Sequence, residues 1–242
     1  MNEFRAQCIA LYEQAFPGES ADFTKALFDR YFPEHIRTVC EDGVPVAMLF
    51  SIPYPLVCAS GTVEARYLYG VATDEQYRGR GLAKRLLTAE ASLHPVFLRP
   101  MTVGLFDFYA KAGFSPISPL LHGTGEATAP TGEEHLLDST AYLAKRAAHA
   151  PLPTCTPTKD LLFLYEQDGG FAACGERAVA LFERHGEEIL FKEYWGDTDA
   201  APAIAAFLGG RRFSWRRYDA TGIPFGMAVG IPAESAFLAA LD

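Results

Sequence analysis

The most informative segment of the sequence is Glu64-Ala-Arg-Tyr-Leu-Tyr-Gly-Val-Ala-Thr-Asp-Glu-Gln-Tyr-Arg-Gly-Arg-Gly-Leu-Ala-Lys-Arg-Leu-Leu87. Residues 67–73 are mostly aromatic or small and apolar, which is typical of a buried strand. Residues 76–81 hold two glycines close together, and glycine weakens the interior of a strand. From Leu82 onward the apolar residues recur with a helical period. The stretch therefore predicts a strand, a turn and an amphipathic helix, in that order.

A turn of this composition at the start of a helix can bind an anion. The first N–H groups of a helix have no partner within the helix, and they carry a partial positive charge. Gly79 and Gly81 present no side chain that would keep a phosphate away from the backbone. Arg78 and Arg80 add two permanent cations suited to phosphate oxygens. The pattern favours a pyrophosphate site, while a plain helix start with solvated arginines stays an alternative.

Known phosphate-binding motifs fit this turn to different degrees. A P-loop needs a Gly-Lys-Ser/Thr ending that is absent here, and a dinucleotide-binding fingerprint needs a third glycine where Lys84 stands. Residues 76–81, Gln-Tyr-Arg-Gly-Arg-Gly, resemble motif A of the GCN5-related N-acetyltransferase (GNAT) superfamily. Residues 108–114, Phe-Tyr-Ala-Lys-Ala-Gly-Phe, resemble a second signature of the same superfamily.

This resemblance implies that acetyl-CoA is the co-substrate and that its pyrophosphate binds at the turn. It also implies that the pantetheine arm runs along the preceding strand, where Gly70 suits a bulge that lets backbone approach a ligand. No metal is expected. The residues implied in acetyl-CoA binding are Val71, Ala72, Thr73, Arg78, Gly79, Arg80, Gly81, Leu82, Ala83 and Lys84.

Two side chains are candidates for catalysis. The resemblance places Tyr109 near the sulfur of CoA, where a neutral phenol could protonate the departing thiolate; an aromatic core residue is the alternative. Glu64 precedes the turn on the same strand and is a candidate general base, with a solvated strand-end charge as the alternative. The backbone N–H of Val71 would polarise the thioester carbonyl.

The rest of the chain predicts a mixed α/β (α+β) fold in two parts. Two helices before residue 33 and a hairpin turning at Asp42-Gly43 precede the decisive stretch. This order matches the GNAT fold, apart from a missing first strand. We expect an acetyl-CoA-binding domain over residues 1–120, with a mostly antiparallel sheet flanked by helices. Residues 121–242 resemble a smaller, degenerate GNAT-like domain, as in the tandem Eis-type acetyltransferases.

The second half differs from the first at the turn. Residues 122–131 predict a loop because glycine, threonine and alanine dominate them, and residues 133–149 predict a helix. Elements then follow in the order of the first half, but Trp195-Gly-Asp-Thr-Asp199 stands where the turn would recur, and its two carboxylates would repel a phosphate. Resemblance to the Eis type makes Asp242 a candidate catalytic carboxylate.

Composition limits the compartment and the partners. Five scattered cysteines without a C-x-x-C pair favour reduced thiols in the cytoplasm over disulfides or zinc. No apolar run is long enough to span a membrane. A net charge of −9 argues against nucleic-acid binding and suits a cationic amine. The basic run at residues 211–217 alternates with aromatic residues, as a half-exposed strand does. A homo-oligomer stays open.

These observations lead to one expected function and two alternatives. We expect a cytoplasmic N-acetyltransferase, an acyltransferase that moves an acetyl group from acetyl-CoA to a primary amine of a small molecule or peptide by direct attack on the thioester. One alternative is a non-catalytic acyl-CoA sensor or interaction module on the same fold. The other is a nucleotide-binding protein that uses the same glycine turn.

Overall fold

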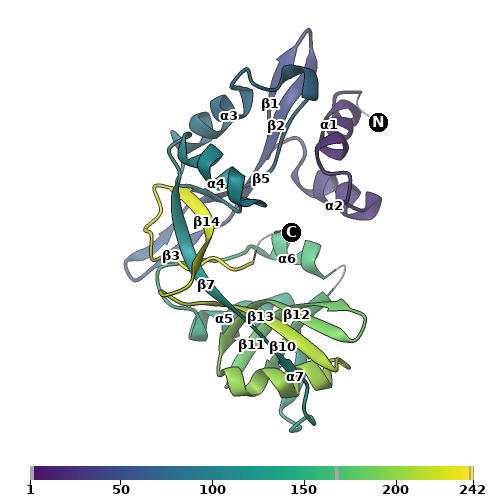
Figure 1. Cartoon of the computed structure of the whole chain (residues 1–242), viewed down its shortest axis with the longest axis vertical. Coiled ribbons are helices and arrows are strands. Elements are labelled where there is room, and N and C mark those ends of the chain that lie inside the picture. Colours follow the sequence, from purple (N-terminus) through teal and green to yellow (C-terminus); the bar gives the residue numbers. More distant parts are fainter. Residues whose placement is uncertain (1–2, 167–168, 240, 242) are drawn as a thin grey trace. The chain divides into compact units, whose positions relative to one another are not determined.

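The structure, a computed structural model, describes residues 3–166, 169–239 and 241, so that Asp242 lies outside the described residues. The chain divides into two compact units (Figure 1). The predicted boundary near residue 120 lies close to the main division, which falls between Pro116 and Ile117. Residues 57–61 belong to the second unit and residues 226–231 to the first. The second unit is about as long as the first. The first unit contains Met1–Leu56, Thr62–Pro116 and Gly226–Ile231, and the second contains Val57–Gly61, Ile117–Phe225 and Pro232–Asp242.

The sheet of the first unit has the strand order β1-β2-β5-β6-β14. Neighbouring strands are antiparallel, except that β5 and β6 are parallel and are connected through helix α3. This confirms the predicted mixed, mostly antiparallel sheet. The elements are α1 (Glu3–Ala15), α2 (Ala21–Tyr31), β1 (Ile36–Glu41), β2 (Val44–Pro53), β3 (Leu56–Cys58), β4 (Gly61–Val63), β5 (Arg66–Thr73), α3 (Leu82–Ala91), β6 (Val96–Leu98), α4 (Val103–Ala110) and β14 (Ile223–Val229).

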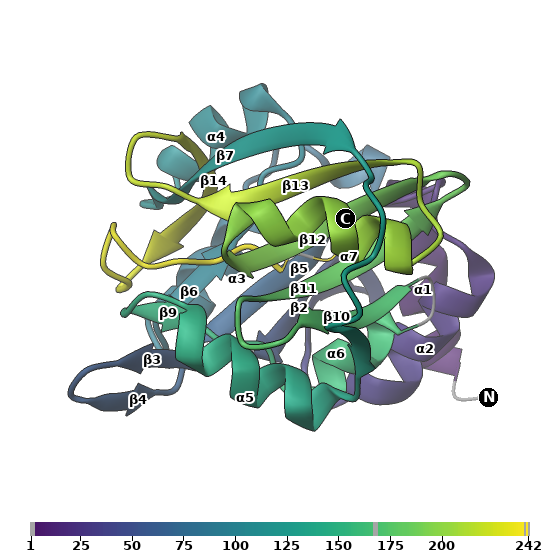
Figure 2. The ribbon, with the colours of Figure 1, turned by 90° about the horizontal axis from the view of Figure 1, so that it is seen from below.

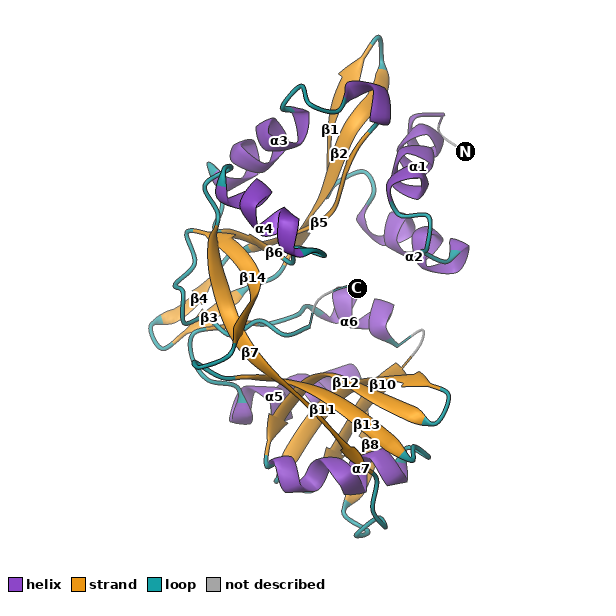
Figure 3. Cartoon of the chain, in the orientation of Figure 1, coloured by secondary structure: helices purple, strands orange, loops and turns teal. Residues whose placement is uncertain are grey.

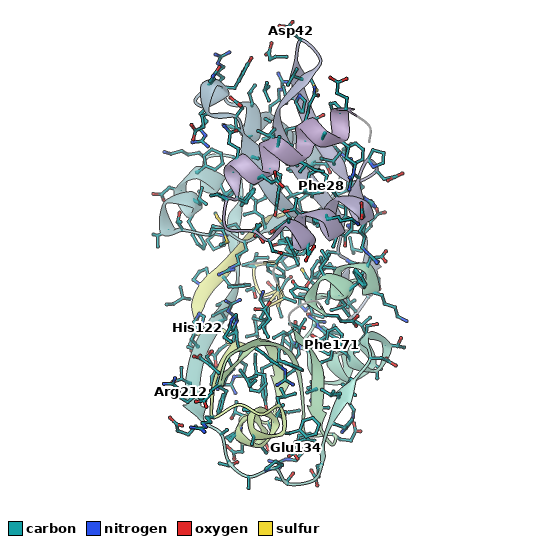
Figure 4. The ribbon with its side chains drawn as sticks, turned by 90° about the vertical axis from the view of Figure 1, so that its right-hand side faces the viewer. Phe28, Asp42, His122, Glu134, Phe171 and Arg212 are labelled. Atoms are coloured by element: carbon teal, nitrogen blue, oxygen red, sulfur yellow. The ribbon has the colours of Figure 1, made fainter. Side chains whose placement is uncertain are left out.

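Local sequence explains where these elements begin and turn. The Ser20 hydroxyl caps α2 by accepting a hydrogen bond from the N–H of Phe23. Asp42 and Gly43 both have positive φ angles, 49° and 81°, as a two-residue hairpin turn requires. Figure 4 shows Asp42 at the tip of the hairpin. The predicted cap and turn are therefore confirmed.

Helices cover both faces of this sheet, with α1 and α2 on one face and α3 and α4 on the other (Figures 1 and 3). On the first face, the ring of Tyr12 meets that of Phe50 edge-on at 6.1 Å. On the second face, Leu68 of β5 packs in one core with Leu87 of α3 and Tyr109 of α4. Tyr69, the next residue of β5, instead lies 6.4 Å from the Tyr12 ring, so that successive β5 side chains contribute to different cores, as the pleat of a strand dictates.

The last strand of the first unit comes from the end of the sequence. Met227, Ala228 and Val229 of β14 pair with Leu98, Phe97 and Val96 of β6 in antiparallel register. Met227 is 1% exposed and belongs to the core that holds α3 and α4. The acetyl-CoA-binding half predicted from residues 1–120 is therefore completed by a strand more than a hundred residues further along the chain.

The second unit repeats this architecture. Its sheet has the order β7-β13-β12-β11-β10-β8, again with one parallel pair, β12 and β13, connected through a helix (Figure 2). β8 pairs with β10, and it supplies the strand before the first helix that the described part of the first unit lacks. The elements are β7 (Ser115–Glu126), β8 (Glu134–Leu137), α5 (Ser139–His149), β9 (Thr154–Cys155), α6 (Lys159–Tyr165), β10 (Gly169–Cys174), β11 (Ala178–His185), β12 (Glu188–Gly196), α7 (Ala201–Phe207) and β13 (Arg212–Tyr218).

Two predictions for this half are wrong. The first half of the predicted loop at 122–131, residues 122–126, belongs to strand β7. Its glycines face aromatic rings of β13: a Cβ at Gly123 would overlap the Trp215 ring, and Phe213 covers Gly125 in the same way. The predicted helix over 133–149 begins only at Ser139. Residues 134–137 form a strand instead, because β10 offers them an edge to pair with.

Within the described ranges, no helix is both long enough and apolar enough to cross a membrane.

Glu134 is expected to make the second unit sensitive to acid. Its carboxylate accepts hydrogen bonds from the N–H groups of Thr131 and Gly132 at 3.0 Å and from the Thr131 hydroxyl at 2.6 Å. Burial raises the pKa of this carboxyl, but these hydrogen bonds outweigh burial and lower the pKa to about 2. Because the folded-state pKa lies below the ordinary value, the stabilisation is complete above about pH 4.5 and is lost as the pH falls toward 2.

Urea denaturation as a function of pH tests this expectation. Glu134→Gln should lower the unfolding midpoint at neutral pH and flatten its decline below about pH 4.5. Glu133→Gln is the matched control, because Glu133 is the exposed neighbour and should leave the midpoint unchanged. Parallel declines of the wild type and Glu134→Gln below that pH would contradict the role of Glu134.

Candidate functional site

A bulge interrupts strand β5 where the sequence predicted one. Met48 of β2 pairs with Ala72, but Phe50 pairs with Tyr69, so that Gly70 and Val71 together oppose a single residue. Gly70 has a φ angle of +60°, and a Cβ there would lie 3.0 Å from the Tyr12 ring. Only glycine suits this conformation and this contact. The predicted bulge is confirmed, and it leaves one residue of β5 outside the ladder.

The parallel partner of β5 ends before this bulge. The register of β5 and β6 consists of Arg66 with Val96 and Tyr67 with Phe97. β5 continues to Thr73, whereas β6 ends at Leu98. The β5 backbone at Val71–Thr73 thus lies beyond the paired part of the two strands. This is the arrangement that the predicted pantetheine contact requires.

The turn after β5 brings the two glycines to the start of α3. Asp74 caps a short 3-10 helix, Glu75–Tyr77, and Gly79 and Gly81 follow with φ angles of 77° and 74°. Such positive φ angles favour glycine. Gly81 occupies the N-cap position of α3 and has no side chain to cap it. The first N–H groups of α3, at Leu82–Lys84, therefore remain available to a ligand.

Both arginines of the turn are held by backbone carbonyl groups. Arg78 Nε donates to the carbonyl of Thr73 at 3.2 Å, and its guanidinium lies 3.4 Å from the Glu75 carboxylate. Arg80 Nη2 donates to the carbonyl of Gln76 at 3.2 Å, and its guanidinium lies over the Tyr77 ring at 4.7 Å. Both arginines are exposed, so each can still donate to an anion at the start of α3.

Tyr109 lies in the core between α4 and the sheet and is 7% exposed. Burial raises the pKa of its phenol to about 12. No hydrogen bond to its hydroxyl is formed within the described part of the chain. The ring thus packs as a core residue, as one interpretation of the sequence predicted, while the hydroxyl keeps its proton and its capacity to donate.

The structure does not bring Glu64 to the turn or to the bulge. The side chain is 66% exposed, and its carboxylate accepts a hydrogen bond from Arg66, at the paired end of β5. Seven residues separate Glu64 from Val71, which corresponds to roughly 20 Å along an extended chain. This placement favours the alternative interpretation, a strand-end charge bound by its neighbour.

Sequence reasoning missed a buried carboxylate on α3. Glu90 is 3% exposed and accepts hydrogen bonds from Ser51 Oγ at 2.5 Å and from Arg37 Nε at 2.6 Å. These contacts attach the end of α3 to β1 and β2, and hence help to fix the helix whose start carries the glycine turn. Glu90 continues the helical spacing of Leu86 and Leu87, and this spacing is the signal that could have identified it.

The corresponding place in the second unit is closed. β12 and β13 pair over four positions, from Glu188 with Arg212 to Phe191 with Trp215, directly up to the bulged residue Lys192. Where the first unit has its glycine turn, Asp197 caps a 3-10 helix and forms an ion pair with Arg177 at 2.6 Å. These features favour the prediction that this half does not bind acetyl-CoA in the same way.

Across residues 3–166, 169–239 and 241, no group of three or more His, Cys, Asp or Glu side chains is arranged to hold a metal ion.

Comparison with protein families agrees with the fold and the turn. The family model of the acetyltransferase (GNAT) domain matches residues 2–116, a little under half of the chain. The resemblance predicted from residues 76–81 and 108–114 is thereby confirmed. The family match supports an acyl-transfer function. No curated protein matches the chain in sequence.

Solved structures share the fold over nearly the whole chain. A conserved protein of Enterococcus faecalis, described as a probable N-acyltransferase, has a TM-score of 0.72 at 15% identity, covering 94% of this chain and 70% of that one. Eis1 of Mycobacterium abscessus has a TM-score of 0.62 at 12% identity, covering 95% and 69%. A tandem GNAT protein from the clavulanic acid biosynthesis pathway has a TM-score of 0.50 at 11% identity, covering 94% of both chains.

Proposed function

We propose that this chain is an acetyl-CoA-dependent N-acetyltransferase that transfers the acetyl group to a primary amine of a small molecule or peptide. The observation that carries the proposal is the uncapped start of α3, which lies at a turn with two arginines and follows a strand with a bulge and an open end. Helix N-termini bind phosphate through their free N–H groups, and arginine matches phosphate oxygens.

The residues present fit acetyl-CoA. The N–H groups of Leu82–Lys84 and the guanidinium groups of Arg78 and Arg80 would hold the pyrophosphate, and nothing lies within 4 Å of a Cβ built at Gly79 or Gly81. The β5 backbone at Val71–Thr73 would hold the pantetheine arm by strand-like hydrogen bonds. Bound there, acetyl-CoA supplies an activated acetyl thioester.

Groups of the chain would then act on the thioester oxygen and on the departing thiolate. The N–H of Val71, which lies at the bulge, would donate a hydrogen bond to the thioester oxygen, where negative charge develops when the amine attacks. The new C–N bond forms as the C–S bond breaks, and the Tyr109 hydroxyl donates its proton to the departing thiolate. The attacking amine loses its proton to water, because Glu64 lies too far from the bulge.

The phosphate loop is tested by removing its charge. Arg78→Ala with Arg80→Ala should weaken acetyl-CoA binding, measured by isothermal titration calorimetry, by about 10- to 100-fold, because each hydrogen bond to a charged group contributes about 1.5–3 kcal/mol and some of it is replaced by water. The matched control is Arg211→Ala with Arg212→Ala, which changes the net charge equally at two exposed residues of the second unit. Unchanged affinity in the first double variant would refute the loop.

The thiols and the net charge support a cellular compartment and a class of acceptor. All five cysteines are free thiols, which favours a reducing compartment and hence the cytoplasm. The net charge of −9 supports a cationic amine acceptor rather than nucleic acid or a membrane surface as the partner. A homo-oligomer remains compatible with these observations, and sedimentation velocity would decide it.

A further inference from the structure

A half-buried carboxylate lies among aromatic rings on the face of the first unit that α1 and α2 cover. Glu19 belongs to the turn between α1 and α2, and its Oε1 accepts a hydrogen bond from the Tyr69 hydroxyl at 3.4 Å. Phe16 is stacked on the Tyr69 ring at 6.4 Å, and Phe23 meets that ring edge-on at 6.5 Å. Glu19, Phe16 and Phe23 are each partly exposed.

This combination of groups suits a cation. A carboxylate supplies the charge, and the faces of aromatic rings attract an ammonium group and accept the carbon atoms beside it. The hydroxyls of Tyr69 and Tyr12 lie 3.0 Å apart, and burial raises the pKa of both phenols, so that they remain neutral. Glu19 thus supplies a carboxylate to this cluster, and the two tyrosines add hydroxyl groups without adding charge.

The cluster is attached directly to the bulge. Tyr69 immediately precedes Gly70 and Val71, and the Tyr12 ring lies against the backbone of Gly70. Glu19, however, contacts the far end of the Tyr69 side chain. The length of a tyrosine side chain therefore separates the carboxylate from the backbone that would hold the thioester, and Glu19 cannot accept the proton of the nitrogen that attacks there.

Resting on the proposed function, we propose that the acceptor is a diamine, or a similar amine with a second cationic group. One amino group attacks the thioester at the bulge. The other stays protonated and binds to the Glu19 carboxylate among the rings of Phe16, Phe23 and Tyr69. Glu19 is then a specificity-determining residue: it selects acceptors whose two nitrogen atoms are about as far apart as a tyrosine side chain is long.

Steady-state kinetics with two amines of equal length test this proposal. With acetyl-CoA held constant, the wild type should show a kcat/KM for 1,5-diaminopentane about tenfold or more above that for 1-aminopentane, since a hydrogen-bonded charge contributes about 1.5–3 kcal/mol. Glu19→Gln should bring the ratio close to one by raising KM for the diamine, while leaving kcat/KM for the monoamine and the affinity for acetyl-CoA unchanged. Glu13→Gln, an exposed glutamate of α1, is the matched control and should keep the wild-type ratio.

The outcomes separate this proposal from the one on which it rests. Equal kcat/KM for the two amines in the wild type, or an equal loss with both amines in Glu19→Gln, would overturn the diamine proposal and leave the acetyltransferase intact. Absence of acetyl-CoA binding by calorimetry, or of transfer to any amine, would overturn both. A diamine preference that survives Glu19→Gln would assign the second cation to another group and overturn the role of Glu19.

Discussion

Met227→Asp is expected to unfold the first unit and to abolish acetyl-CoA binding, although residue 227 lies more than a hundred residues beyond the matched GNAT domain. Met227 is 1% exposed, pairs with Leu98 of β6 and packs in the core beneath α3. A carboxylate at this position would be buried without a partner, which costs about 3–5 kcal/mol. Urea denaturation and calorimetric titration with acetyl-CoA measure the two effects.

The same strand provides the control for this experiment. Ile223 begins β14, is 75% exposed, and lies outside the segment that the first unit contains. Ile223→Asp should change the free energy of unfolding by no more than about 0.5 kcal/mol, as exposed substitutions usually do. If the two variants lost equal stability, or if Met227→Asp bound acetyl-CoA like the wild type, β14 would not be needed to hold the α3 turn.

Tyr109→Phe is expected to reduce turnover by about 100-fold or more, because a positioned general acid contributes about 10²- to 10⁴-fold. The substitution removes one hydroxyl and keeps the ring that packs in the core, so that stability and the affinity for acetyl-CoA should stay close to wild-type values. Initial rates of thiol release with a panel of amines measure turnover, and calorimetry measures affinity.

The pH profile distinguishes an acid from a packing residue. Burial raises the pKa of Tyr109 to about 12, so that the phenol keeps its proton well above the ordinary tyrosine value near 10. Wild-type kcat should therefore stay level between about pH 8 and 11. It should fall only near pH 12, where the Tyr109 phenol loses its proton. A fall of kcat centred near pH 10 would contradict this assignment.

A second tyrosine controls for the loss of a hydroxyl. Tyr218→Phe removes the hydroxyl that donates to the Glu234 carbonyl in the second unit, and it should leave kcat unchanged.

If acetyl-CoA bound tightly but no amine in a broad panel were acetylated by the wild type, the chain would be an acyl-CoA sensor rather than an enzyme.

Local patterns predicted much of this fold. The positive φ angles of Gly79 and Gly81, the bulge at Gly70 and the hairpin turn at Asp42 follow from short-range sequence, because glycine and turn preferences act over a few residues. Local sequence does not predict the strand within residues 122–131, because their glycines suit a strand only when Trp215 and Phe213 cover them. That contact joins residues some ninety positions apart in sequence.

The candidate site likewise contains residues that the sequence predicts and residues that become apparent only in the structure. The arginines and glycines of the turn were identified from their spacing, and the structure places them together at the start of α3. Glu64 was chosen for its residue type and its place before the turn, but strand geometry keeps it from the bulge. Glu19 gave no signal of its own, because it becomes notable only when Tyr69, fifty residues later, donates a hydrogen bond to it.

The strand, glycine turn and helix at residues 64–87 follow from the sequence alone, since local backbone preferences and helix N–H chemistry need no distant partner. Packing between distant segments was needed to make β14 the last strand of the first unit, because several strands could compete for the open edge of β6 and packing of side chains such as Met227 selects one of them. It also decided that the second unit is closed where the first is open, since pairing of β12 with β13 up to Lys192 depends on register between distant segments.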